Sequence, residues 1–209
     1  MAEKFRFYTL WLIAICIVVY VLQQVIPGFT DMFILNNSAI SNLEIWRFLT
    51  SIFLHGTIAH LFYNMVALLL FGIISEKLIG GKKFLVLFFA SGIIANIISV
   101  NFYSSSLGAS GAIMGLIGCL AIIRPFMMVW TIAPLPMIVA AIVYVAIDLF
   151  GVFYPTGTGN IAHLSGIAVG VLFGLIIRII NGDYSFREKR QRVTIPENYM
   201  RSWEDNFMK

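Results

Sequence analysis

Four polar side chains stand within otherwise apolar stretches of the chain: His60, Asn64, Ser110 and His163. Polar groups cost free energy in an apolar environment, so each of them is a candidate for function. A serine hydroxyl, an imidazole and amide donors supply a nucleophile, a base and groups that stabilise a developing negative charge. His60 and Asn64 are one helical turn apart, so both face the same side of a helix. Together these residue types form the set that hydrolysis of an amide bond requires.

The composition decides what kind of structure must position them. Of the 209 residues, 60% are hydrophobic and 11% are charged, and the mean hydropathy is +0.92. Soluble domains are about 45–50% apolar and about 25% charged, so the sequence predicts a membrane protein. At about 20 residues per span, its apolar stretches predict six transmembrane helices. These are expected over residues 8–26, 58–79, 84–102, 108–124, a segment that ends near 153, and 160–180.

The spans are expected to form one all-α membrane domain over residues 1–181, a six-transmembrane-helix bundle with a long membrane-associated first loop. That loop, residues 29–57, mixes polar and large apolar side chains, and Trp46 is expected to anchor it at the membrane surface. The start of the fifth span stays open, because residues 126–136 contain two prolines. Residues 182–209 are expected to be a polar cytoplasmic tail.

Lysine and arginine residues predict the orientation, since they are enriched in the loops on the cytoplasmic side. With six spans, 13 of the 14 basic residues fall on one side, and only Arg47 falls on the other. We therefore expect a multi-pass protein of the cell membrane with both termini in the cytoplasm. The polar residues of spans two, four and six then lie towards the extracytoplasmic side. The same bias accounts for the net charge of +4 without nucleic acid as a partner.

Glycine spacing indicates which spans pack closely. The fourth span carries glycines at 111, 115 and 118, and the sixth span carries them at 166, 170 and 174. At these spacings each helix presents a face of small residues, which allows two backbones to approach each other. We therefore expect spans four and six to lie in close contact.

Four motifs resemble those of the rhomboid family of intramembrane serine proteases. Gly108-Ala109-Ser110-Gly111 looks like its GxSG motif, His60 to Asn64 resembles its HxxxN element, Ala162 to Gly170, with Gly166, resembles its AHxxGxxxG element, and Trp46-Arg47 matches its WR pair. The resemblance covers essentially the whole chain, from the first span to the sixth. GxSG alone is a weak signal, but four motifs in order on the appropriate spans are highly specific.

The resemblance implies a role for each of these residues. It implies that Ser110 is the nucleophile and His163 is its general base. It also implies that Asn64, His60 and the backbone amide of Ser110 bind the oxyanion. The motif glycines and the Trp-Arg pair would then be structural, with Trp46 and Arg47 bracing the first loop.

The orientation of the base is a separate question. No acidic residue lies near His163 in the sequence, and Asp148, near the outer end of span five, is the only acid well inside a span. We therefore expect a Ser-His dyad rather than a triad, with the imidazole oriented by packing and hydrogen bonds. The family often has an aromatic residue four positions after the serine, stacked on the base, where this chain has Met114. A thioether also packs against an imidazole, so we expect an altered rate or orientation rather than inactivity.

No cofactor or metal is expected. His55 and His60 are five residues apart, so they point to different faces if both are helical, which argues against a shared metal ion. The sequence has no HExxH zinc motif. A single intramembrane aspartate also excludes a catalytic pair of aspartates.

The sequence thus predicts an intramembrane serine endopeptidase that hydrolyses peptide bonds in or next to transmembrane segments of membrane proteins. Its expected partners are transmembrane protein substrates and the lipid bilayer. A helix hides its carbonyl groups from attack, so substrates are expected to contain helix-weakening residues near the outer boundary. Two alternatives stay open: a rhomboid-like protein that binds membrane clients without cutting them, and a small transporter that uses the polar residues as a permeation site.

Overall fold

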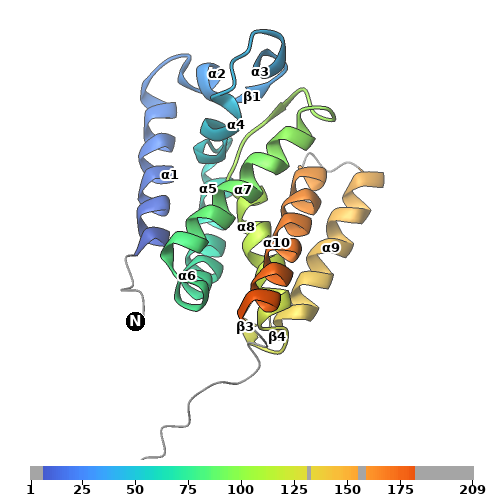
Figure 1. Ribbon diagram of the computed structural model, residues 1–209. Helices are drawn as coiled ribbons and strands as arrows, with labels where there is room; N and C mark the ends of the chain where they lie inside the picture. Colours follow the sequence, from blue (N-terminus) through green and yellow to red (C-terminus); the bar gives the residue numbers. More distant parts are fainter. Residues whose placement is uncertain (1–6, 131–132, 155–158, 182–209) are drawn as a thin grey trace, which may run out of the picture.

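The computed structural model describes residues 7–130, 133–154 and 159–181. Helices dominate this part of the chain (Figure 1). The long ones are α1 (Tyr8–Val25), α7 (Gly81–Ser99), α8 (Ser110–Ile123), α9 (Met137–Phe153) and α10 (Asn160–Asn181). A further segment consists of α5 (Ile58–Ala67), a π-helical turn η2 (Leu68–Gly72) and α6 (Ile73–Ile79). The predicted tail at 182–209 lies outside the described residues.

Four helical segments are long and apolar enough to cross a membrane. They are Tyr8–Val25, Ile58–Ile79, Gly81–Ser99 and Asn160–Ile180. The helices α8 and α9 are also apolar but shorter, with 14 and 17 residues. Helix α8 is short because the chain from residue 100 to residue 109 is not α-helical. The apolar helices therefore lie where the sequence predicts them, and the count of six spans stays a prediction.

Two short strands before α9 determine where that helix begins. The strand β3 (Met128–Trp130) pairs antiparallel with β4 (Pro134–Pro136), and Val129 lies opposite Leu135. Proline lacks the N–H that a helix needs and disfavours helical backbone in the residue before it. Helix α9 therefore begins at Met137, directly after the segment 126–136 over which the sequence left its start open.

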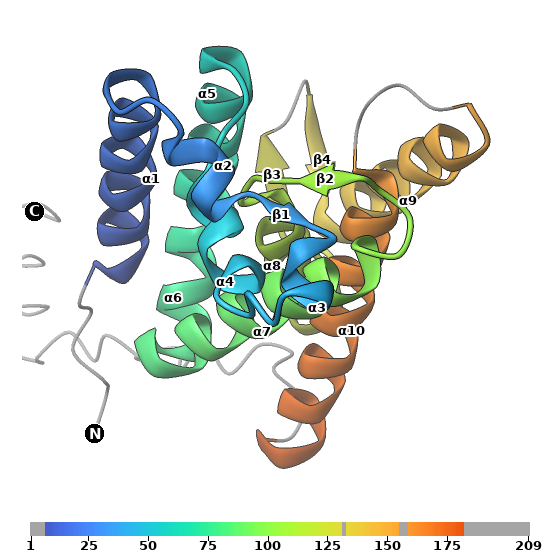
Figure 2. The ribbon, with the colours of Figure 1, turned by 90° about the horizontal axis from the view of Figure 1, so that it is seen from above.

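Helix α8 lies at the centre of the bundle. It stands behind α7 and α10 in Figure 1, and the view from above shows helices around it (Figure 2). Of its 14 residues, 12 are buried, and Leu116 and Leu120 are fully enclosed. Helices α1 and α9 lie at opposite edges in both views and expose large apolar side chains such as Trp11 and Phe150. Exposed apolar side chains of this kind are what a lipid-facing helix presents.

Helices α8 and α10 touch through their glycines. A Cβ atom at Gly166 would overlap the carbonyl oxygen of Gly111, and one at Gly170 would overlap the carbonyl oxygen of Gly115. Only glycine permits this approach, because any other residue would place a carbon atom inside the neighbouring backbone. The predicted close contact between the fourth and sixth apolar segments is confirmed.

The first loop covers the end of the bundle at which α8 and α10 begin (Figure 1). Its elements are α2 (Phe29–Phe33), β1 (Leu35–Asn36), α3 (Ser38–Ser41), α4 (Arg47–Thr50) and the 3₁₀ turn η1 (Ser51–Phe53). Strand β1 pairs with β2 (Ser105–Ser106), which lies in the connection between α7 and α8. The loop is therefore joined by main-chain hydrogen bonds to the segment that leads into Ser110.

Arg47 holds this loop together. Its side chain is buried, pairs with Glu44, and donates to the carbonyl oxygens of Asp31 at 2.7 Å and Ile34 at 2.8 Å. The indole N–H of Trp46 donates to the carbonyl oxygen of Met32 at 3.3 Å. A buried guanidinium with these partners ties three turns of the loop to one point, as the bracing role requires.

The described basic residues separate into two groups along the bundle. Lys77 lies in the last turn of α6, Lys82 and Lys83 lie in the first turn of α7, Arg124 follows α8 and Arg178 lies in the last turn of α10. All five lie at the end of the bundle opposite to the first loop, whereas Arg47 lies in that loop. This distribution agrees with the charge pattern used to predict the orientation, and the orientation itself stays a prediction.

Candidate active site

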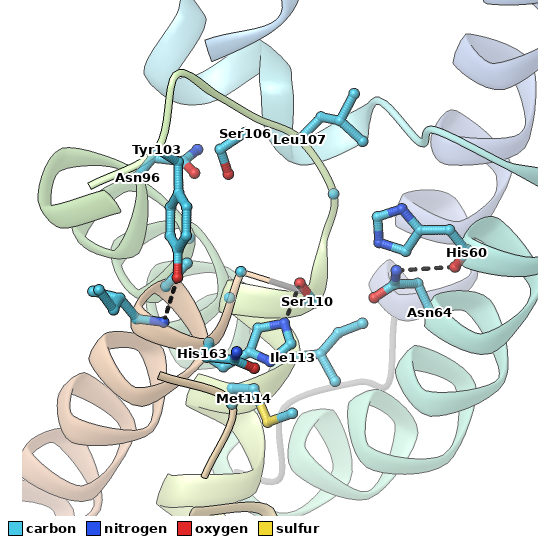
Figure 3. Close-up of a pocket in the computed structure, with 18 of the residues that line it drawn as sticks. His60, Asn64, Asn96, Tyr103, Ser106, Leu107, Ser110, Ile113, Met114 and His163 are labelled. Atoms are coloured by element: carbon cyan, nitrogen blue, oxygen red, sulfur yellow. Dashed lines mark hydrogen bonds between the residues drawn. The ribbon is translucent and has the colours of Figure 1, made fainter. Parts of the chain in front are cut away.

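A cavity of about 910 Å³ opens at the end of the bundle that the first loop covers. Residues from α5, α7, α8, α9, α10 and the connection that contains β2 line it. All four polar residues singled out in the sequence, His60, Asn64, Ser110 and His163, are among its lining residues (Figure 3). The helices thus bring together side chains that are up to 103 positions apart in the sequence.

The backbone before α8 places Ser110 in the cavity. Gly108 has φ +121°, a left-handed conformation that L residues rarely adopt, and a Cβ atom there would lie 2.8 Å from the His60 ring. The N–H of Gly108 donates to the carbonyl oxygen of Ser51 at 2.9 Å, and the Ser51 hydroxyl accepts from Asn96 at 2.9 Å. Helix α7 and η1 therefore fix the turn that delivers the serine.

Ser110 and His163 are directly hydrogen-bonded. The hydroxyl oxygen of Ser110 lies 2.8 Å from Nε2 of His163. Both side chains project from the first turns of their helices, and α8 and α10 are held in contact by the glycines one to two turns further along. At this distance the imidazole can act as a general base and take the proton of the hydroxyl group.

His163 also has an acidic partner, which was not predicted from the sequence. Oδ1 of Asp148, on α9, lies 2.9 Å from Nδ1 of His163. The sequence predicts a Ser-His dyad whose imidazole is oriented by packing and hydrogen bonds. The structure places a carboxylate among these hydrogen-bond partners, and the dyad itself stays a prediction. Helices α9 and α10 follow one another in the chain and pack together, so a residue near the end of one meets a residue near the start of the next. A separation of 15 positions hides this contact from inspection of neighbouring residues.

His60 and Asn64 line the same cavity from α5. The amide nitrogen of Asn64 donates to the carbonyl oxygen of His60 at 3.0 Å, which uses one of its two N–H groups. The backbone N–H of Ser110, at the first position of α8, has no acceptor within its helix. All three residues line the cavity that contains the serine hydroxyl, and their predicted part in binding an oxyanion stays a prediction.

One further residue of this region, Tyr103, was not identified from the sequence. The Tyr103 hydroxyl accepts from the backbone N–H of Ile161 at 3.0 Å and so ties the connection before α8 to the first turn of α10. Met114 lines the cavity one turn after Ser110, as its position in the sequence predicts. No signal marks Tyr103 in the sequence, whereas Asp148 carried one, since an acid within an apolar segment is a candidate for function.

His55 lies just before α5 and is almost fully buried, with 1% of its surface exposed. It precedes the helix, so the helical geometry assumed for the His55–His60 pair does not apply, and the two rings pack edge to face with centroids 5.1 Å apart. Burial, and secondarily the charge of His60, lowers the pKa of His55 to about 4, although the carbonyl oxygen of Phe53 acts in the opposite direction. Within the described residues, no three His, Cys, Asp or Glu side chains gather as metal ligands.

The burial of His55 predicts how the folding free energy depends on pH. The folded state holds His55 neutral, so the unfolded state takes up a proton first as the pH falls below the ordinary value of 6.5. Between pH 7 and pH 4 we expect the wild type to lose up to about 3 kcal/mol more folding free energy than His55→Asn, which does not titrate. Unfolding of both proteins in mixed micelles at several pH values measures this difference. Parallel curves would contradict the assignment.

Comparison with known proteins relates this geometry to a family. Residues 42–179, about two thirds of the chain, match the family profile of the rhomboid domain. The chain belongs to the rhomboid family. The all-α membrane fold and the apolar helices agree with this membership, and this rhomboid is an integral membrane protein.

Several relatives carry rhomboid names. The chain is 37% identical over 151 residues to RHOMBOID-like protein 4 of Arabidopsis thaliana, covering 70% of this chain and 37% of that protein. It is 35% identical over 174 residues to Rhomboid protease GluP of Bacillus subtilis, covering 78% and 33%. It is 27% identical over 174 residues to Rhomboid protease GlpG of Haemophilus influenzae, covering 80% and 89%. The rhomboid chain thus spans less than half the length of the first two relatives and most of the third.

Proposed function

We propose that this rhomboid is an intramembrane serine endopeptidase that hydrolyses peptide bonds in or next to transmembrane segments of membrane proteins. The observation that carries the proposal is the 2.8 Å hydrogen bond between Ser110 and His163 inside a cavity that also contains the Asn64 and His60 side chains. Relatives named as rhomboid proteases support the same activity.

In this proposal the first half of the reaction forms an acyl-enzyme. The Ser110 hydroxyl oxygen attacks the carbonyl carbon of the scissile bond while its proton moves to Nε2 of His163. The carbonyl oxygen becomes an oxyanion, and in this proposal the N–H groups of Asn64, His60 and the Ser110 backbone bind it. The tetrahedral intermediate then collapses, the C–N bond breaks, and the imidazolium gives its proton to the departing amine.

The second half repeats the chemistry with water. His163 takes a proton from a water molecule as the water oxygen attacks the ester carbon, and the same proton then returns to the Ser110 oxygen when the ester bond breaks. Both steps use only side chains of the protein and water. The cavity of about 910 Å³ has room for an extended peptide segment and for the water.

We also propose an orientation of the protein across the membrane. Six spans, cytoplasmic termini and a cavity towards the extracytoplasmic side are supported by the five described basic residues at the end opposite to the cavity. A cysteine introduced at Ser105 is then expected to react with an impermeant thiol reagent added to intact cells, and one at Lys82 only after permeabilisation. Labelling in the reverse pattern would overturn the orientation. The native Cys16 and Cys119 are buried, so we expect little background reaction from them.

The substrate class follows from the depth of the site within a helical bundle. A peptide in an α-helix keeps its carbonyl groups hydrogen-bonded and out of reach, so the segment to be cut must unwind. Transmembrane proteins with helix-weakening residues near the extracytoplasmic boundary, and small side chains near the cut, are the proposed substrates. The same requirement makes folded soluble proteins poor substrates.

A panel of transmembrane substrates tests the proposal. The full chain is incubated in liposomes with segments that differ in helix-weakening residues, and the products are mapped by mass. We expect cuts near the extracytoplasmic boundary that disappear in Ser110→Ala and persist in Ser165→Ala. Ser165 is a suitable control because it lies on α10 and its hydroxyl donates to the carbonyl oxygen of Ile161 within the same helix. Stable binding of uncut segments by the wild type would instead support the client-binding alternative.

A further inference from the structure

Asp148 is a buried acid in an apolar helix. Only 3% of its surface is exposed, and among the residues that the structure describes its Oδ1 meets Nδ1 of His163 at 2.9 Å. Its other oxygen, Oδ2, is buried without a hydrogen-bond partner in the same part of the chain. Burying a carboxylate is costly unless it is paired, so the contact with His163 is the feature that accounts for an acid at this position.

The contact determines which nitrogen of the imidazole is free. An ionised carboxylate only accepts hydrogen bonds, so Nδ1 of His163 carries the proton that it donates to Asp148. In a neutral imidazole, Nε2 then has a lone pair, and it faces the Ser110 hydroxyl at 2.8 Å. The carboxylate also stabilises the imidazolium that forms when the serine proton is transferred.

We infer that Asp148 is a positioning residue and that it completes a Ser-His-Asp triad across α8, α10 and α9. The inference rests on the proposed function and extends the two-residue mechanism expected from the sequence. It assigns to a carboxylate the orientation of the base in a chain that has Met114, rather than an aromatic ring, one turn after the serine. Asp148 acts through His163 and does not contact the substrate.

The local packing of α9 supports this arrangement. Gly151 lies one turn after Asp148, and a Cβ atom there would overlap the amide group of the buried Asn160 side chain. The missing side chain lets the start of α10 sit against α9 at the level of the acid. Because the three groups belong to three helices, a displacement of α9 away from α10 would withdraw the carboxylate from the imidazole.

Kinetics of Asp148 variants test the inference. We expect Asp148→Asn and Asp148→Ala to lower kcat by about 100-fold or more, since the corresponding change in a soluble serine protease costs about 10⁴-fold. KM is expected to change less than about threefold, because the carboxylate does not touch the substrate. Ile147→Ala is the matched control, since this neighbour on α9 is 61% exposed. A purely structural role would lower the amount of folded protein and leave kcat per folded molecule unchanged, which would overturn the inference.

If the Asp148 variants do not fold, the position of the proton on the His163 ring can be measured in the wild-type protein instead. The chain has three histidines, so selective nitrogen-15 labelling gives a spectrum with few imidazole signals. We expect a strongly hydrogen-bonded Nδ1 proton that disappears in His163→Ala. The Nδ1 proton of His55, whose ring nitrogen lies 3.2 Å from the carbonyl oxygen of Phe53, is expected to give a second signal that stays in this variant. A His163 imidazole protonated at Nε2 in the resting protein would overturn the inference. Two results separate failure of the proposed function from failure of this inference. If Ser110→Ala cuts substrates as fast as the wild type, the proposed function fails. If Ser110→Ala is inactive but the Asp148 variants keep the wild-type kcat, only the inference about Asp148 fails.

Discussion

Ser110→Ala, His163→Ala and the double variant are expected to have almost the same residual activity. Each is expected to lower kcat by about 10⁵–10⁶-fold, as in soluble enzymes in which the serine and histidine act as one unit. The reason is the 2.8 Å hydrogen bond, since a hydroxyl without its base and a base without its hydroxyl are equally unable to start the reaction. Single-turnover cleavage of a transmembrane substrate in liposomes measures all three rates.

The double variant is the informative member of this set. If the two side chains act independently, its loss is the product of the single losses, far below either one. Multiplicative losses would therefore contradict a shared mechanism. Ser165→Ala, on the same helix as His163, is expected to retain full activity and shows that a serine removed elsewhere does no harm.

Gly170→Ala is expected to damage both the fold and the site. Its new Cβ atom would overlap the carbonyl oxygen of Gly115 on α8, and neither backbone can move without separating the two helices. Overpacking typically costs about 1–3 kcal/mol. The three nearest atoms are all backbone atoms of Gly115, which cannot rotate away as a side chain could, so we place this variant at about 3 kcal/mol or more. Because α8 carries Ser110 and α10 carries His163, separation of the helices also breaks the hydrogen bond between them.

Gly56→Ala is the matched control for this prediction. A Cβ atom at Gly56 would lie 3.7 Å from the nearest side chain, Leu107, which is an ordinary contact. We expect it to change the folding free energy by less than about 1 kcal/mol. Unfolding in mixed micelles compares the two variants, and a Gly170→Ala protein as stable and active as Gly56→Ala would show that α8 and α10 are not as close as described.

Much of the fold was predictable because hydrophobic segments and glycine spacing are local signals. The apolar helices lie where the hydropathy places them, and the glycines of α8 and α10 indicated which two helices touch. The site residues on α5, α8 and α10 were found for the same reason, since a polar group in an apolar segment is visible in the sequence itself. Proline chemistry likewise explains why α9 starts at Met137.

The features that escaped prediction depend on contacts between distant residues. Asp148 was noticed as an unusual acid, but its partner depends on how α9 and α10 pack, and periodicity does not specify that arrangement. The bond from Ile161 to the Tyr103 hydroxyl joins residues 58 positions apart. The pairing of β1 with β2 involves two residues on each side, too few for a pattern. These contacts are the ones that align the base and the turn before the serine.

The most direct test of the central claim is the mass of the intact protein after reaction with a serine-directed fluorophosphonate. The geometry of Ser110 and His163 predicts a single covalent adduct, located on Ser110 by peptide mapping. The adduct is expected to be absent in Ser110→Ala and His163→Ala and to form at the wild-type rate in Ser165→Ala. An adduct on another residue, or undiminished labelling of Ser110 in His163→Ala, would contradict the account.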